Sequence, residues 1–407
     1  MVAGGAVGQL VTLLLAPVLT RLYTPADFGV LAVFTSIISI LGVLTTLRLE
    51  VAVVLPESEE EAAAVAWLAG TCAIVVALVI GAAGPLVAAP LGALLDAPAL
   101  PGLWWLVALT SLLVGAFQLL SAWITREQRY SALGLRNFSL GTATVGGQLG
   151  LGLLGAGSIG LLLGQAAGYL AAVCGLGSAR RALRRPARGA VLAALRRYRR
   201  FPLVASWSAV LNSAGQQAPI LVVSAMYGQF VVGLLGLTVR VLAAPVVLVG
   251  RAVAQVFLGE ASAASRTRTG DMARQLRNTV LALVAIGALP ALVLALFAPA
   301  LFGVLFGAQW VEAGHYAQLL SLGYLAQFAV SPVSQTLLLL ERQALQLTWD
   351  SSRLVLTCGA PLACAVLGAP ADVAVAALSA AFVVSYTALF LTCWRLARRQ
   401  TVAVATA

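Results

Sequence analysis

Long apolar stretches separated by short polar segments recur along the whole chain. A helix needs about 20 mainly apolar residues to cross the hydrocarbon core of a bilayer. Twelve stretches come close to this length or exceed it, at about residues 2–20, 29–55, 63–88, 102–124, 137–156, 158–178, 203–226, 230–251, 279–299, 316–340, 351–368 and 373–394. The first stretch has no basic leader and no clear cleavage motif, so we expect a transmembrane helix there and not a signal peptide. The pattern predicts an all-α integral membrane protein with about twelve transmembrane helices.

The composition agrees with a chain that lies in a membrane. Of the 407 residues, 61% are hydrophobic and only 10% are charged, whereas soluble domains carry about 25% charged residues. The five cysteines all fall inside apolar stretches and lack metal-ligand spacing with acids or with the single histidine. We therefore expect them to be small packing residues. These features exclude an ordinary soluble globular protein and predict neither a metal site nor a cofactor.

The basic residues are all arginine, and they are distributed unevenly between the apolar stretches. Of the 25, 21 lie in alternate polar segments, at about 126–136, 180–200, 266–277, 342–353 and 395–399, while only Arg21 lies in the opposite segments. Loops rich in Lys and Arg remain in the cytoplasm. The distribution predicts that both chain ends are cytoplasmic, which an even number of helices requires. It also accounts for the net charge of +11 without nucleic-acid binding.

The longest basic stretch divides the chain into two sets of six apolar stretches. It predicts an N-terminal lobe at 1–179, a basic cytoplasmic linker at 180–202, and a C-terminal lobe with a short tail at 203–407. Within the linker, Val191, Leu192, Leu195 and Tyr198 recur at helical spacing. Such a pattern suits a helix lying on an anionic membrane surface. A solvated linker that only sets the topology is an equally good interpretation.

The two halves show weak internal similarity. Arg48 precedes Glu57 by nine residues, and Arg251 precedes Glu260 by the same distance. Gly-Gln pairs also stand in the first apolar stretch of each half, at 8–9 and at 215–216. This similarity favours two pseudo-symmetric six-helix bundles around a central cavity, a plan that transporters use.

Three motifs carry a resemblance to a known family. TRLYTPADFGVLAVF, LRLEVAVVLPESEEEAAAV and RRFPLVASWSAVLNSAGQQAPILVVSAMYG resemble the polysaccharide-biosynthesis flippases of the multidrug/oligosaccharidyl-lipid/polysaccharide (MOP) exporter superfamily. The resemblance implies two six-helix lobes around a V-shaped cavity in the bacterial cytoplasmic membrane. It further implies translocation of a polyprenyl-pyrophosphate-linked sugar unit by alternating access. Membrane lipids, and the glycan polymerase and glycosyltransferases of the same pathway, are the partners it suggests for a monomeric transporter.

The resemblance also implies where cargo is bound. Flippases of this family line their cavity with cationic side chains on the first, second and eighth helices. In this chain the second helix offers Arg48, and the eighth offers Arg240 and Arg251. The first helix departs from the pattern, because it has no charge before Arg21.

Arg48 and Glu50 stand directly before another apolar run. Counted from Gly29, Arg48 lies about 28 Å along a continuous helix at 1.5 Å per residue, near the cytoplasmic end of the hydrocarbon core. Residues two apart point to different faces of a helix, so we expect no pairing between Arg48 and Glu50. Glu50 would then be free for ion coupling or for an arginine of the other lobe. A guanidinium suits a pyrophosphate; the alternative is that Arg48 snorkels to the headgroups.

Two further polar residues lie deep in apolar stretches. Arg240 is about ten residues into its helix, roughly 15 Å deep, where a charge needs a cavity or a partner. We expect it to contact cargo, and a structural ion pair is the alternative. Gln216 suits sugar hydroxyls, with interhelical hydrogen bonding as the alternative. The acidic run ESEEE is interpreted as a loop and helix start, because acids favour a helix N-terminus.

Catalysis has little support in the sequence. There is no P-loop, no metal-ligand cluster and no Ser/His/Asp constellation, so we expect no enzyme. Other interpretations stay open: a multidrug-extruder-like transporter, which would favour cavity acids for cationic drugs, a membrane-embedded glycan polymerase or ligase, and an assembly scaffold.

Overall fold

The computed structural model describes residues 11–175, 186–267, 272–334, 336–337, 340 and 342–405. Every regular element in these ranges is helical. The chain divides into two compact units, of which the first ends at Gly233 and the second begins at Leu234. The predicted N-terminal lobe, basic linker and C-terminal lobe are defined by function and not by compactness, so this division stays a prediction.

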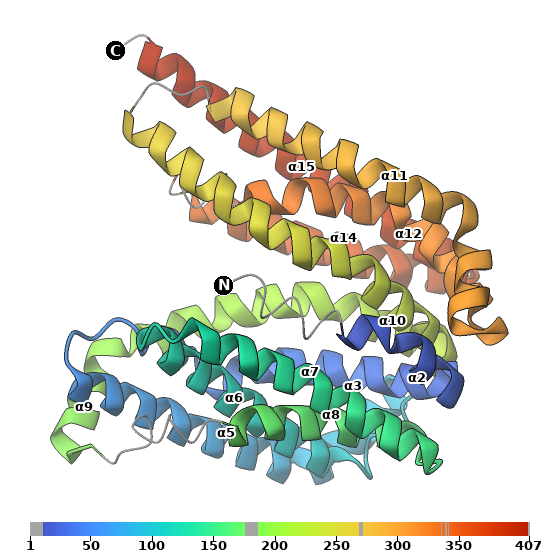
Figure 1. Cartoon of the computed structure of the whole chain (residues 1–407), viewed down its shortest axis with the longest axis horizontal. Helices are drawn as coiled ribbons and strands as arrows, with labels where there is room; N and C mark the ends of the chain where they lie inside the picture. Colours follow the sequence, from blue (N-terminus) through green and yellow to red (C-terminus); the bar gives the residue numbers. More distant parts are fainter. Residues whose placement is uncertain are drawn as a thin grey trace. The chain divides into compact units, whose positions relative to one another are not determined.

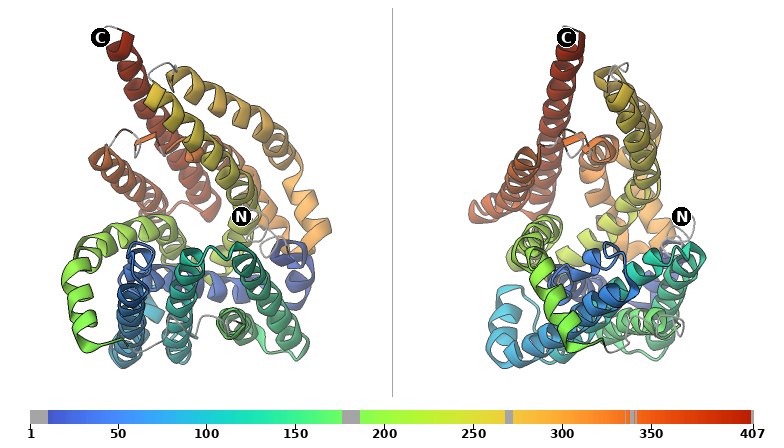
Figure 2. Two further views of the ribbon diagram at one scale, coloured as in Figure 1. Left: turned by 60° about the vertical axis from the view of Figure 1, so that its left-hand side comes forward. Right: turned by 90° about the vertical axis from the view of Figure 1, so that its left-hand side faces the viewer.

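The first unit is built around one central helix, α6 (Trp104–Arg126), which packs against five other helices of the unit. Figures 1 and 2 show the long helices of this bundle running side by side. The remaining elements of the unit are α2 (Ala16–Leu22), α3 (Pro25–Thr45), α4 (Leu49–Ala52), α5 (Glu59–Leu94), α7 (Tyr130–Leu153), α8 (Gly157–Cys174), α9 (Arg188–Tyr198), a π-helical turn (Phe201–Ala205) and the first part of α10 (Ser206–Thr267).

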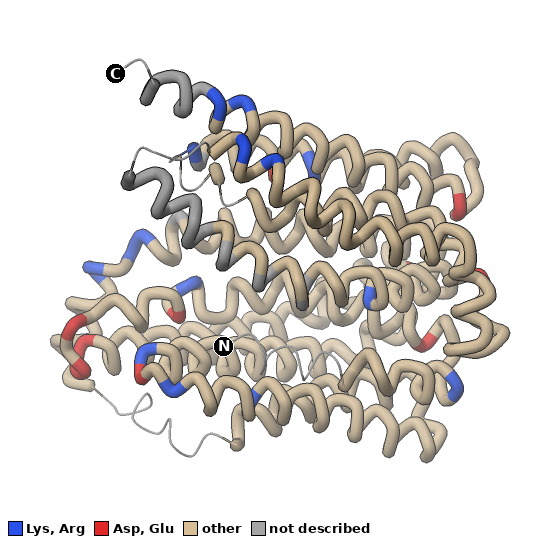
Figure 3. The backbone as a smooth tube through the Cα atoms, turned by 45° about the horizontal axis from the view of Figure 1, so that its top comes forward, with Lys and Arg blue, Asp and Glu red and all other residues tan. Residues whose placement is uncertain are grey.

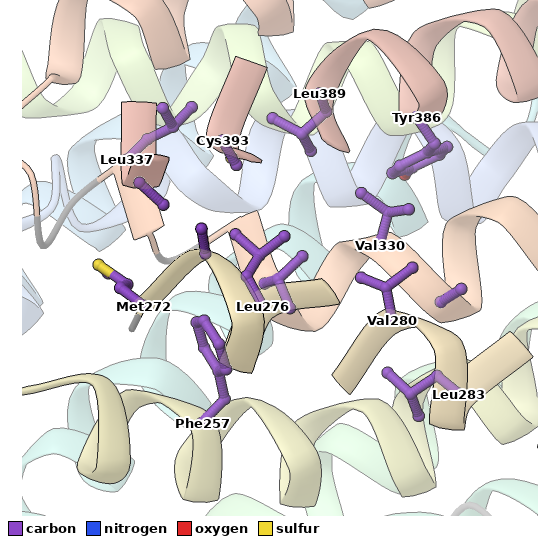
Figure 4. Packing of buried hydrophobic residues seen from close by; sticks show 14 of the residues in the cluster. Phe257, Met272, Leu276, Val280, Leu283, Val330, Leu337, Tyr386, Leu389 and Cys393 are labelled. Carbon is purple, nitrogen blue, oxygen red and sulfur yellow. The ribbon is translucent and has the colours of Figure 1, made fainter. Parts of the chain in front are cut away.

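The second unit packs its helices around a continuous apolar core. Figure 4 shows side chains such as Leu276, Val330, Leu389 and Cys393 converging from different helices. Cys393 is fully buried in this core, as expected of a packing residue. The elements are the later part of α10, α11 (Met272–Phe306), a 3-10 turn (Ala308–Trp310), α12 (Val311–Val330), a second 3-10 turn (Ser331–Ser334), α14 (Gln343–Val366) and α15 (Ala371–Ala405).

Within the described residues, each predicted apolar stretch overlaps a helix, but several boundaries differ from the prediction. Helix α10 is broken at Gly228, whose φ of 83° and ψ of 173° are not helical. This break separates the stretches predicted at 203–226 and 230–251. Helix α5 runs on through Pro85 and Pro90 to Leu94, beyond the predicted end at 88, because neighbouring helices and local adjustments compensate for proline in membrane helices.

The described helices have the length and composition of membrane spans. Seven of them are long and apolar enough to cross a bilayer by these criteria alone. Figure 3 shows that the middle parts of the helices carry few charged residues. Charges buried in hydrocarbon are costly, so this distribution is the one a bilayer imposes.

The motif that contains TPADFG begins α3 and fixes its packing. Thr24 and Asp27 form a reciprocal capping box, and Pro25 occupies the first turn, where no backbone donor is needed. Gly29 lies so close to the start of the later α10 segment that an added Cβ would be 2.0 Å from the Gln229 carbonyl oxygen. A Cβ on Gly233 would be 1.7 Å from the Pro25 carbonyl oxygen. The two glycines therefore allow backbone-to-backbone contact, as small residues do in membrane bundles.

We expect Gly29→Ala to destabilise the protein by about 1–3 kcal/mol, because the backbone of Gln229 cannot move aside as a side chain would. Gly146 in α7 is the matched control, since an added Cβ there meets nothing within 4 Å. Thermal unfolding of the purified protein in detergent measures both variants. Equal melting temperatures for Gly29→Ala and Gly146→Ala would show that this close approach is not part of the folded state.

Candidate functional site

The second predicted stretch does not form one continuous helix. Helix α3 ends at Thr45, and Leu47 and Arg48 adopt left-handed φ values of 49° and 60°. Tight turns carry the chain onward, with the Leu47 amide bonded to the Leu44 carbonyl and the Leu49 amide to the Thr46 carbonyl. Left-handed conformations cost non-glycine residues free energy, and they persist where surrounding contacts enforce them. The expectation that Arg48 lies on a straight helix running to residue 55 is therefore wrong.

Arg48 and Glu50 form an ion pair, contrary to the expectation from helical geometry. The Arg48 Nη1 atom lies 3.3 Å from the Glu50 Oε1 atom. The helical rule fails because the left-handed turn at Arg48 brings the two side chains to the same side. Thr46 Oγ1 donates a hydrogen bond to the other carboxylate oxygen of Glu50. Glu50 is only 6% exposed, while the Arg48 side chain is 38% exposed, so the guanidinium keeps access to a ligand.

Arg126, at the end of α6, holds the segment that follows this ion pair. Its guanidinium donates to four backbone carbonyl oxygens, those of Val53, Pro56, Glu57 and Ser58. These carbonyls lie between α4 and α5, where no helix supplies donors. Sequence reasoning used Arg126 only as a marker of topology. No local sequence pattern indicates that Arg126 binds these carbonyls, because they lie 68–73 residues away in the chain.

The acidic run begins α5, as the sequence indicated. Ser58 is the N-cap, and its Oγ atom accepts a hydrogen bond from the Glu61 amide at 3.2 Å. Glu61 also pairs with Arg197 of α9 at 2.9 Å and accepts a hydrogen bond from the Tyr198 hydroxyl at 3.2 Å. Burial, together with the negative charge of Glu61, raises the pKa of Tyr198, so the phenol stays protonated and remains a donor.

The first part of α10 contacts α3 through polar side chains. Ser36 Oγ donates to Gln217 Oε1 at 3.1 Å, and Ser213 Oγ donates to the Ser39 carbonyl oxygen at 2.9 Å. Gln216 is exposed, and its amide contacts only the Asn212 carbonyl of its own helix, at 3.5 Å. Gln217 is thus the glutamine that bonds between helices, and Gln216 keeps a side chain that other groups can reach. Gln9 lies outside the described residues.

An apolar cavity of about 570 Å³ lies in the first unit between α3, α5, α6 and the first part of α10. All of its lining residues are apolar, among them Ile37, Leu41, Val87, Trp104 and Leu221. The only polar group of Trp104, its indole nitrogen, is bonded to the Ile80 carbonyl oxygen at 2.7 Å. A cavity of this chemistry takes hydrocarbon and not water.

The cations predicted on the eighth helix belong to the second unit. Arg240 lies in the later part of α10, twelve residues after the break at Gly228, and its side chain is half-buried. Twelve residues span about 18 Å of helix, and the depth of Arg240 in a bilayer stays a prediction. Arg251 is a helical residue of α10, but its side chain lies outside the described part of the structure.

Two arginines expected in polar loops lie inside helices. Arg136 of α7 is buried, with Nη1 3.0 Å from the Phe117 carbonyl oxygen and its guanidinium 3.7 Å from the centre of the Phe117 ring. Arg353 of α14 is also buried. Its Nη2 atom lies 3.4 Å from the Asp350 Oδ1 atom, and its guanidinium lies 4.9 Å from the centre of the Trp349 ring. Hydropathy detects only the apolar part of a helix, and arginine is a good helix former, so both helices begin earlier than predicted.

Among the described residues, no group of three or more His, Cys, Asp or Glu side chains has the arrangement of a metal site. In the first unit, an ion-paired but accessible guanidinium lies three residues beyond the end of α3, and an apolar cavity lies beside that helix. Such an arrangement suits binding of an amphipathic anion.

Comparison with known proteins gives one family match and several structures of the same fold. A family profile described as "Polysaccharide biosynthesis protein" matches residues 18–315. No protein among curated sequences is significantly similar to the chain. Similar solved structures include the lipid II flippase MurJ in an inward closed conformation, with a TM-score of 0.70 and 12% identity over 99% of this chain and 89% of that one.

Two further structures have the same fold. One is an inward-facing multidrug resistance MATE family transporter of the MOP superfamily, with a TM-score of 0.62 and 15% identity over 100% of this chain and 94% of that chain. The other is a MOP superfamily transporter from Pyrococcus furiosus described as having a binding pocket of reversed polarity, with a TM-score of 0.52 and 14% identity over 100% and 95%. The prediction of an all-α integral membrane protein with the MOP fold is confirmed.

The left-handed turn at Leu47 can be tested by glycine substitution. Leu47→Gly should relieve about 1–2 kcal/mol of backbone strain, whereas Leu44→Gly should cost about 1 kcal/mol of helix propensity. Both leucines are half-buried, so the loss of side-chain contacts is similar. Thermal unfolding in detergent should therefore show Leu47→Gly as the more stable variant by roughly 2–3 kcal/mol. If Leu44→Gly is equally stable or more so, α3 continues through residue 47.

Proposed function

The chain belongs to the family of polysaccharide biosynthesis proteins, and we propose that it is a flippase for polyprenyl-pyrophosphate-linked oligosaccharides. It would move these units across the bacterial cytoplasmic membrane by alternating access, for O-antigen, capsule or exopolysaccharide synthesis. The observation that carries the proposal is the family match over residues 18–315. The MOP fold, which the chain shares with a lipid II flippase, supports it.

Arg48 supplies the chemistry for the head of this cargo. Its guanidinium has five donor hydrogens, and the ion pair with Glu50 engages one of its nitrogens. The other donors remain for a pyrophosphate, which guanidinium groups bind in bidentate fashion. In this proposal Glu50 orients Arg48, and Arg240 and Arg251 contribute positive charge from the second unit. Gln216, exposed on α10, bonds sugar hydroxyls.

The apolar cavity suits the other end of the cargo. Leu41, one of its lining residues, lies in the last turns of α3 and precedes Arg48 by seven residues. A polyprenyl chain requires such a hydrocarbon surface next to its charged head. This combination favours a lipid-linked substrate over a water-soluble sugar.

A transporter of cationic drugs would need an accessible acid. Glu50 and Asp350, two acids that are not fully exposed, each lie within salt-bridge distance of an arginine. Both carboxylates are thus already neutralised. The multidrug alternative is therefore less consistent with this chain than the flippase proposal.

The cargo role of Arg48 predicts a graded response in a strain that depends on this protein. Arg48→Lys keeps the charge but loses the bidentate geometry, so export of surface glycan should fall several-fold, and Arg48→Glu should abolish it. Arg240→Gln should also impair export while leaving membrane insertion intact. Glycan export at matched expression, with accumulation of the lipid-linked precursor, is the measurement.

Arg129 provides the control for this experiment. Like Arg48, it pairs with an acid two residues away, Glu127, at 3.2 Å, and it is exposed. Arg129→Lys and Arg129→Glu should leave export close to normal. Full activity of Arg48→Lys with only mild impairment of Arg48→Glu would make Arg48 an interfacial anchor instead of a cargo residue.

The orientation follows from the same proposal and has its own test. The arginine-rich segments should face the cytoplasm together with both chain ends. Reporter fusions placed after Arg200 and at the C-terminus should both report a cytoplasmic location. A periplasmic signal from either fusion would contradict the orientation without bearing on the identity of the cargo.

A further inference from the structure

We propose that the outward face of α9, with the turn that leads into α10, is a binding surface for anionic phospholipid headgroups. We call it the α9 surface, and it comprises Leu192, Leu195, Arg196, Arg199, Arg200, Leu203 and Trp207. This lipid is not the transported cargo, so the inference goes beyond the flippase function and does not depend on it.

The inner face of α9 is already occupied by the protein. Ala194 and Tyr198 are 1% and 6% exposed and pack in one core cluster with residues of α5 that include Ala62 and Ala69. An ion pair between Arg197 of α9 and Glu61 of α5, at 2.9 Å, also connects the two helices. Helix α9 is therefore part of the first unit, and the interpretation as a merely solvated linker does not account for these contacts.

The outer face is apolar where a water-exposed linker would be polar. Leu192 and Leu195 are 51% and 44% exposed, and Leu203 and Trp207, just after α9, are 66% and 64% exposed. The apolar residues predicted to form one face of this helix are thus divided, with Tyr198 turned to the protein and the two leucines turned away. Exposed apolar residues grouped in this way mark a surface that binds something.

The charges of the α9 surface are positive and available. Arg196, Arg199 and Arg200 are exposed, and within the described residues none of the three takes part in an ion pair. The acids on the first turn of α5 are Glu59, Glu60 and Glu61. Glu61 is engaged by Arg197, and the three arginines of the α9 surface outnumber the two remaining acids, Glu59 and Glu60, so the net charge there is positive.

Anionic lipid is the occupant that fits both properties. The α9 surface lies beside the first turns of α5, a helix long and apolar enough to cross a membrane, and therefore at the level where that helix enters the bilayer. Leucine side chains can enter the acyl boundary while arginines reach phosphates. An indole at this level is typical of membrane interfaces. A soluble acidic partner would account for the arginines, but not for four large exposed apolar side chains beside them.

Trp207 serves as the reporter in a direct binding test. The full-length protein is reconstituted in phosphatidylcholine vesicles that contain a minor fraction of phosphatidylglycerol, with a doxyl quencher on one lipid or the other. The Trp207 signal is the difference between the wild type and Trp207→Phe. Each basic residue near an anionic surface contributes about 1 kcal/mol, or roughly fivefold enrichment. Labelled phosphatidylglycerol should therefore quench Trp207 at least about fivefold more efficiently than labelled phosphatidylcholine, mole for mole.

Matched variants decide what causes the preference. Replacing Arg196, Arg199 and Arg200 together by Gln should remove it, and replacing them by Lys should retain it, since the attraction is to charge. Gln at Arg277, Arg342 and Arg395, which are exposed elsewhere, should leave it unchanged. Salt at about 1 M, where the Debye length is about 3 Å, should abolish it. Equal quenching by the two labelled lipids overturns the proposal, and so does a preference that survives the Gln substitutions in α9 or is lost in the control variant.

Discussion

The guanidinium of Arg126 supports the segment between α4 and α5. A chain that leaves the helical conformation has carbonyl groups that need other hydrogen-bond donors. Arg126 reaches the carbonyls of Val53, Pro56, Glu57 and Ser58, and in doing so connects the end of α6 to the segment before α5. These bonds hold the segment just after α4, the short helix that follows Arg48. Arg126 thus anchors the chain next to the candidate site, although no binding role is assigned to it.

The guanidinium groups of this chain differ in how far they are buried. Arg136 contacts a helix carbonyl, the Ser121 hydroxyl and an aromatic ring. Arg353 contacts an aspartate and a tryptophan ring. Both side chains are almost fully buried. Arg48 is the contrasting case, because its ion pair leaves 38% of the side chain exposed. Exposure, and not depth in the membrane, is therefore what distinguishes a cargo candidate from a structural cation in this chain.

The lengths of the apolar stretches were sufficient to predict the helices, because a stretch of about 20 apolar residues has few alternatives to a membrane span. Hydropathy did not predict where the helices end. Helices α5, α7 and α14 all extend beyond their apolar parts, because helix formation continues where hydropathy falls. The site was harder to predict. Arg48 and Glu50 were found by their unusual position, but their pairing was missed because helical geometry was assumed across residues that adopt left-handed conformations. Arg126 was missed because its partners are distant in sequence, and a single sequence carries no sign of such contacts.

The ion pair with Glu50 also bears on why the chain uses arginine at position 48. An ammonium group is a point charge, and a carboxylate and a phosphate would compete for it at the same place. A guanidinium can donate to Glu50 from one nitrogen and present its other edge to a second anion. Because Glu50 is buried and bonded to Thr46, it stays in place when a ligand arrives, so Arg48 need not exchange one partner for another. The ion pair engages one guanidinium nitrogen, so the remaining N–H groups of Arg48 stay available while the carboxylate fixes the direction in which they point.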